Sequence, residues 1–178
     1  VTIPESVREI GEWAFSGCTG LIEVMISKGV RKIGEWAFSG CTGLTSVAVP
    51  ESVREIGESA FRDCTRLTSV TIPERVTKIG EGVFSGCMDL TQIEIAPGNR
   101  QFSVENGLMI SEKRHCVIFA MGNLTSVTIP DSVTKIGEEA FRGCKGLTSI
   151  TIPAGVTEIG CAAFWHCTGL TSVTIPDG

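Results

Sequence analysis

The sequence predicts a repeat solenoid, a coil of stacked turns built mostly from short β-strands. Phe recurs every 23 residues within two groups, and Cys follows each of these Phe residues by three positions. Val and Ile keep the same period, and self-similarity at a fixed period is typical of repeat proteins. Because one turn cannot bury its own apolar face, about seven turns must stack into a rod on the order of 35 Å long. The repeated Phe positions are 15, 38, 61, 84, 141 and 164.

The repeat unit reads L-T-S-V-T-I-P-x-x-V-T-K-I-G-E-x-A-F-x-G-C-x-G. Its period lies in the range of about 20–29 residues that leucine-rich repeats occupy. In the unit that begins at Leu67, Val70 and Ile72 alternate with polar residues, which predicts a strand with one buried face. Pro73 has no N–H to give to a ladder, so we expect it to end the strand. Pro recurs at this position in residues 4, 50, 130, 153 and 176.

The second half of each unit predicts a shorter extended segment and a corner. Val76 to Ile79 has strand-like spacing, and Gly80 supplies backbone freedom for the corner that follows. Residues 81–84 suffice only for one helical turn or a tight bend. Stacked units therefore give two parallel ladders of short strands, with about 23 residues per coil.

One unit, residues 90–123, is 11 residues longer than the others, and the array resumes in phase after it. Asn106-Gly107 is a strong hairpin-turn signal, so residues 102–105 and 108–111 are the predicted arms of a β-hairpin. A second turn at 112–114 leads to a buried strand at 116–120. We expect this insert to bulge from an otherwise uniform rod. It either carries recognition, with Arg100 and Phe102 as candidate contacts, or is a tolerated insertion on the rod's flank.

The pattern L-T-S-V-T-I-P-x-x-V-x-x-I-G-x-x-A-F-x-x-C resembles the BspA-like leucine-rich repeats over nearly the whole chain. The long unit also resembles a variant repeat of that family, N-x-x-F/Y-x-x-x-D-G-V-L, read here from Asn99 with Asn106 in place of Asp. The chain has no Tyr, whereas many family units carry one near the Phe. The resemblance implies a secreted or cell-surface protein of a bacterium or protist, with a role in adhesion.

Composition narrows the function classes. The 178 residues are expected to form a single solenoid domain, cut at both ends because the chain begins and stops within a unit. A net charge of −5 argues against nucleic acid or an anionic membrane as the main partner. No apolar run approaches the roughly 18 residues of a membrane span. Two His, no Tyr and no catalytic motif predict a protein that is not an enzyme and needs no cofactor.

The eight Cys residues invite a disulfide or metal interpretation, but six of them share one repeat position. In-register Cβ atoms of neighbouring turns stay about 4.8 Å apart, beyond the usual disulfide range, which favours buried free thiols. Cys161 differs because it replaces a Glu that recurs at 12, 35, 58, 81 and 138, so we expect it to be exposed. A Cys161–Cys167 bridge is the alternative. The row of Glu residues itself favours a solvated edge of mixed charge over a Ca²⁺ site.

Trp13 and Trp36 occupy equivalent positions in neighbouring units, two residues before the Phe. They are expected to stack. Their position is expected to reach the surface, because it otherwise holds Ser59, Gly82, Glu139 and Ala162. Two exposed rings either anchor a partner or shield the corner of the coil.

The outward strand positions predict a flat, hydroxyl-lined sheet face with little charge. Two functions fit this face. A binding or adhesion module would contact an extracellular-matrix or cell-surface protein through it, whereas a structural spacer would bind no ligand. The rungs Gln92/Glu94 and Glu23/Met25 interrupt the hydroxyl ranks that ice binding would need. We expect a monomer with possible end-to-end contacts. The candidate contact residues on the face are Ser46, Ser69, Thr71, Gln92, Glu94, Ser126, Thr128, Ser149 and Thr151.

Overall fold

In a computed structural model of the chain, the described residues 1–175 wind into a β-solenoid of about seven turns with about 23 residues per turn. Pro176, the last of the repeated prolines, lies outside these residues. Residues 1–175 contain no helix, and each corner predicted as a helical turn or bend is a run of tight turns. The predicted solenoid of parallel ladders is thereby confirmed.

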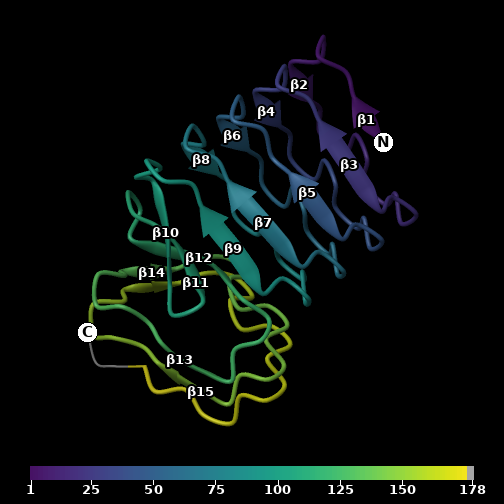
Figure 1. Cartoon of the computed structure of the whole chain (residues 1–178). Coiled ribbons are helices and arrows are strands. Elements are labelled where there is room, and N and C mark those ends of the chain that lie inside the picture. Colours follow the sequence, from purple (N-terminus) through teal and green to yellow (C-terminus); the bar gives the residue numbers. More distant parts are fainter. Residues whose placement is uncertain (176–178) are drawn as a thin grey trace.

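The N-terminal turns carry two parallel ladders, which run side by side in Figure 1. Neighbouring strands pair in register 23 residues apart, as Ser46 with Ser69. The strand Ser69–Ile72 (β7) ends directly before Pro73. The first ladder consists of β1 (Thr2–Ile3), β3 (Glu23–Ile26), β5 (Ser46–Ala48), β7 (Ser69–Ile72) and β9 (Gln92–Ile95). The second consists of β2 (Glu9–Ile10), β4 (Lys32–Ile33), β6 (Glu55–Ile56) and β8 (Lys78–Ile79).

Where a corner packs on a preceding turn, the glycine at its start is needed for space. A Cβ on Gly80 would lie 2.3 Å from the backbone nitrogen of Glu58 in the preceding turn. The left-handed conformation falls two residues later instead, at the position of Trp36 (φ 56°) and Gly82 (φ 61°). The prediction that Gly80 supplies conformational freedom was therefore wrong: the close approach of stacked turns leaves no room for a side chain.

The insert forms the three strands that the sequence predicts, β10 (Phe102–Glu105), β11 (Leu108–Ser111) and β12 (Cys116–Ala120). All three pair antiparallel in order, and Asn106 and Gly107 at the hairpin turn have φ of 53° and 76°. However, the expectation that the insert bulges from a uniform rod was wrong, and it does not sit on the flank either. Every residue of β11 and β12 is buried, because the insert stands inside the stack.

The insert divides the hydrophobic core into two clusters. Alternate residues of its strands face opposite ways, so Met109 and Ile118 join the N-terminal cluster, whereas Ile110 and Val117 join the C-terminal one. The phenylalanine stack shows the same division. Phe38 and Phe61 stack at 5.3 Å between centroids, but the ring of Phe119 meets the last N-terminal ring edge-on, at 69°.

Beyond the insert the array restarts with new ladders. The counterpart of the second ladder begins with the insert strand β12. This strand pairs in parallel with β14 (Lys135–Ile136), and β14 pairs with β16 (Glu158–Ile159). The counterpart of the first ladder is the separate pair β13 (Ser126–Thr128) and β15 (Ser149–Thr151), which lies well away from β9 in Figure 1. The stack is therefore two blocks, residues 1–98 and 123–175, joined across the insert.

Candidate interaction faces and the seam between the blocks

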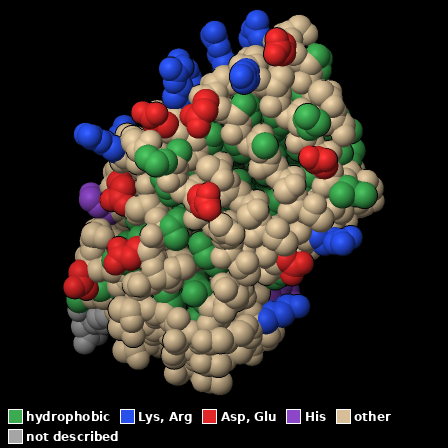
Figure 2. All heavy atoms as spheres, viewed as in Figure 1, with side chains coloured by type: hydrophobic (Ala, Val, Ile, Leu, Met, Phe, Trp, Pro, Cys, Tyr) green, Lys and Arg blue, Asp and Glu red, His purple; other side chains and the backbone are tan. Residues whose placement is uncertain are grey.

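The outward positions of β3, β5, β7 and β9 form one face, which we call the first face. Its charged outward residues are Glu23 and Glu94, and Figure 2 shows a row of Lys and Arg side chains along the edge over β2, β4, β6 and β8, with others at the opposite edge. Ser46 and Thr71 are exposed and Ser69 is half-buried. On the last strand of this face, the Gln92 amide donates to the Glu94 carboxylate at 2.7 Å, so these two side chains are bonded to each other.

The outward positions of β13 and β15 form a separate second face. Ser126, Thr128, Ser149 and Thr151 are all exposed on it and line a hollow of about 410 Å³. The tip of the insert hairpin reaches this hollow, where the Asn106 side-chain amide donates to the Thr128 carbonyl at 3.2 Å. The single continuous face predicted from the sequence is therefore two faces, because the insert displaces β13 from β9.

Trp13 and Trp36 stack as predicted, with centroids 4.8 Å apart and planes 3° from parallel. Trp13 is 55% exposed, while Trp36 is half-buried and lies under the guanidinium of Arg62, 5.4 Å from its ring centroid. The same corner position is buried at Ser59 and Glu139, and it is exposed again at Ala162 in the last unit. The expectation of a uniformly exposed corner position was therefore wrong at the junction of the two blocks.

The two candidate contacts in the insert lie in different environments. Arg100 is exposed, whereas Phe102 is only 5% exposed and packs into the N-terminal core cluster. Phe102 therefore contributes the wall of a cleft and no protruding contact.

All eight cysteines are free thiols, as predicted for the six at the repeat position, but two of those six are not buried: Cys18 is exposed and Cys167 is half-buried. Cys161 is exposed, as expected, and forms no bridge to Cys167. The repeated cysteine is a hydrogen-bond donor as well as a small apolar side chain: Cys41 Sγ donates to Phe15 O at 3.1 Å, and Cys64 repeats this contact one turn on. Burial raises the pKa of Cys41 and of Cys144 to about 12. Cys18 is exposed because its corner is stacked on one side only within this chain.

The edge with the repeated Glu residues is of mixed charge. Cross-turn ion pairs follow the second ladder, as between Lys78 and Glu55 at 2.6 Å and between Lys135 and Glu158 at 2.9 Å. Partial burial, together with the charges of neighbouring carboxylates, raises the pKa of Glu58. In the described part of the chain, no three His, Cys, Asp or Glu side chains converge as metal ligands.

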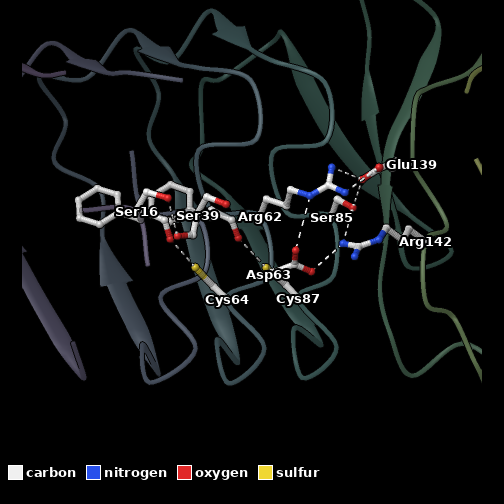
Figure 3. A network of polar contacts seen from close by, with 11 residues as sticks. Ser16, Ser39, Arg62, Asp63, Cys64, Ser85, Cys87, Glu139 and Arg142 are labelled. Carbon is white, nitrogen blue, oxygen red and sulfur yellow. Dashed lines mark hydrogen bonds and ion pairs between the residues drawn. The ribbon is translucent and has the colours of Figure 1, made fainter. Parts of the chain in front are cut away.

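A polar cluster that sequence reasoning missed joins the two blocks at their corners; we call it the seam network (Figure 3). Glu139 accepts from Arg62 Nη1 at 2.6 Å and from Ser85 Oγ at 2.5 Å. In the opposite direction, Arg142 Nη1 donates to Asp63 Oδ1 at 2.7 Å. Two ion pairs therefore cross between the blocks: in one the arginine belongs to the N-terminal block, and in the other it belongs to the C-terminal block. The hydroxyl of Ser85 contacts both Glu139 and Arg142.

The only sequence signal for the seam network was a departure from the repeat. The corner dipeptide that is Ser-Gly in three units becomes Arg62-Asp63 in one and Arg142-Gly143 in another. These partners lie 79 residues apart, on opposite sides of the insert, so no local pattern links them.

The fold and its faces define a class: a β-solenoid repeat protein with inward Leu, Ile and Phe and hydroxyl-lined outer strands. The chain belongs to the BspA-type leucine-rich repeat family, of which six repeat copies match residues 1–105 and 115–178. This confirms the resemblance seen in the sequence. A comparison with curated protein sequences finds no match.

Solved structures similar to this chain include three proteins of bacteria. A leucine-rich repeat protein from Eubacterium ventriosum is 26% identical with a TM-score of 0.75, over 93% of this chain and 50% of that one. A leucine-rich cell surface protein from Faecalibacterium prausnitzii is 28% identical with a TM-score of 0.67, over 96% and 59%. The pneumococcal vaccine antigen PcpA shares the fold at 22% identity and a TM-score of 0.78, over 98% and 50%. The chain thus spans about half the length of these proteins. Within residues 1–175 no helix is long and apolar enough to cross a membrane.

Proposed function

We propose that this chain is a non-catalytic protein-binding module of a secreted or cell-surface protein, acting in adhesion. Its partner would be a protein of the extracellular matrix or of another cell, and residues 1–178 would act as one solenoid module. The family supports the module, and the surface location draws on the relative from Faecalibacterium prausnitzii, which is itself described as a cell surface protein.

The observation that carries the proposal is the second face. Four exposed hydroxyls and the Asn106 amide surround a hollow of about 410 Å³ with no charged side chain in its lining. Hydroxyl and amide groups both donate and accept hydrogen bonds, so such a surface suits the polar groups of a partner's backbone. At the hairpin tip, Asn106 adds a side chain from outside the ladder to the lining of this hollow, which supports selectivity at this end of the module.

Arginine substitutions test which face binds. The chain and its variants Ser69→Arg and Thr128→Arg would be measured by interferometry against immobilised extracellular-matrix proteins and by adhesion to cultured cells. A guanidinium in the hollow blocks close approach, so Thr128→Arg should weaken binding at least about tenfold. Thr134→Arg, an exposed threonine next to β14 on the other ladder, is the matched control and should leave binding unchanged.

A spacer without its own ligand gives a different outcome. The purified chain would then bind nothing in the panel, and neither Ser69→Arg nor Thr128→Arg would change adhesion of the protein that carries it. Circular dichroism of each variant shows that the fold is retained.

A further inference from the structure

The second ladder stops at β8 with its edge open. In every earlier turn, two carbonyls of this ladder accept N–H groups from the next turn: Arg54 O accepts from Thr77 N at 2.9 Å, and Ile56 O accepts from Gly80 N at 2.9 Å. The equivalent acceptors of the last turn are Thr77 O and Ile79 O. Within residues 1–175 no strand pairs with β8 on this side, because the sheet order ends there.

The array resumes at the insert, away from this edge. His115 O and Val117 O accept from Thr134 N and Gly137 N, both at 2.8 Å, so β12 takes the place of a second-ladder strand in the next block. Since β12 does not lie against β8, one strand position of the ladder is left open between the blocks.

A cleft of about 460 Å³ occupies this position; we call it the β8 cleft. One wall is the β8 edge from Thr77 to Glu81, and the other comes from the insert. Phe102 gives this cleft an apolar wall, which suits the side chains of an extended peptide. The insert residues that line it are Gln101, Phe102, Ser111, Lys113 and Arg114.

The lining of the β8 cleft is basic, although the chain as a whole is acidic. Lys113 and Arg114 face one carboxylate, Glu81, and the third cation, Lys78, is paired with Glu55 outside the lining. Glu81 already faces two cations, Arg114 Nη1 at 3.8 Å and Lys135 Nζ at 3.5 Å. Among the described residues Lys113 has no ion-pair partner, so the cleft carries positive charge available to a ligand.

Arg114 already supplies one of the hydrogen bonds that a further strand would make. Its Nη2 donates to Ile79 O at 3.1 Å, the carbonyl that accepts a backbone N–H in each earlier turn. Its other contacts are long, at 3.4 Å to Ser111 Oγ and 3.8 Å to Glu81, so an incoming N–H displaces it at small cost. The displaced guanidinium is then free to pair with a carboxylate of the incoming segment.

We propose that the β8 cleft binds an extended, acidic segment of a partner protein as an added strand of the second ladder. Backbone N–H groups of the segment bond to Thr77 O and Ile79 O, and its carboxylates pair with Lys113 and Arg114. This site is separate from both hydroxyl-lined faces and goes beyond the proposed function, so either can fail while the other holds.

The test uses the full chain, labelled with ¹⁵N, and an eight-residue peptide that alternates valine and glutamate. We expect saturable binding that weakens with added salt, with amide shifts confined to residues 77–81 and 111–115. N-methylation of alternate peptide residues, which removes the donors, should weaken binding about tenfold. Replacing glutamate by lysine in the peptide should abolish it.

Two variants locate the site. Lys113→Glu reverses an exposed charge at the cleft and should raise the Kd at least about fivefold, whereas Lys145→Glu makes the same change at an exposed position elsewhere and should not. Gln101→Trp fills the cleft and should remove binding. No saturable binding below about 1 mM overturns the proposal. It is also overturned if the shifts map to the second face, or if binding is equal in Lys113→Glu and Lys145→Glu.

Discussion

Truncation of Glu139 in the seam network should destabilise the junction between the two blocks. Its carboxylate accepts from Arg62 at 2.6 and 2.9 Å and from Ser85 at 2.5 Å. In Glu139→Ala, Arg62 keeps only a 3.5 Å contact to Asp63 and its position over Trp36. The side chain of Arg62 is 19% exposed and that of Glu139 is 9%, so water reaches the stranded guanidinium only in part.

The magnitude follows from this burial. Removing one partner of a fully buried ion pair costs about 3–5 kcal/mol, and partial exposure of the Arg62 guanidinium brings the expected loss to about 2–4 kcal/mol. With a urea dependence of about 2 kcal/mol per molar, the unfolding midpoint should fall by about 1–2 M. The assay is urea unfolding followed by tryptophan fluorescence, because Trp36 lies against Arg62.

The matched control is an ion pair of equal length at the surface. Lys78 and Glu55 are 2.6 Å apart but 69% and 31% exposed, so Glu55→Ala should cost less than about 1 kcal/mol. The double variant Arg62→Met/Glu139→Met should lose less than the sum of its single changes, since no charge is left unpaired. Equal losses in Glu139→Ala and Glu55→Ala would refute the reasoning.

Three further predictions concern the interior. Phe61→Ala should lower the free energy of unfolding in urea by about 3–5 kcal/mol. Phe15→Ala should lower it clearly less, because Phe15 is half-buried and stacked on one side only. Equal losses in the two variants would contradict nearest-neighbour stacking. Gly57→Ala places a Cβ 2.5 Å from backbone and should cost about 1–3 kcal/mol, whereas Gly11→Ala meets nothing within 4 Å and should be nearly neutral. At pH 8, iodoacetamide should modify the exposed cysteines and spare Cys144, whose pKa of about 12 keeps it a thiol; mass spectrometry of the native chain showing rapid Cys144 alkylation would contradict this.

The local structure of the insert was predictable, but its place in the molecule was not predicted. The three strands have the expected bounds because the Asn106-Gly107 turn fixes the hairpin register through two adjacent left-handed residues. The apolar runs at 108–110 and 116–120 lack alternation, which is typical of strands buried on both faces. That signal indicates a strand inside the stack, and it was available from the sequence.

By itself, the sequence determined the period, the inward and outward sides of each strand, the corners and the family. These depend on contacts between equivalent residues of adjacent turns, so one unit carries the information for all of them. Only the tertiary structure decided that the stack divides into two blocks, that the sheet face is broken, and that Arg62 meets Glu139. These features depend on how each face of the insert packs against its block. They cannot be read from the repeat, because a contact between residues 77 apart, such as that of Arg62 with Glu139, does not follow the 23-residue period.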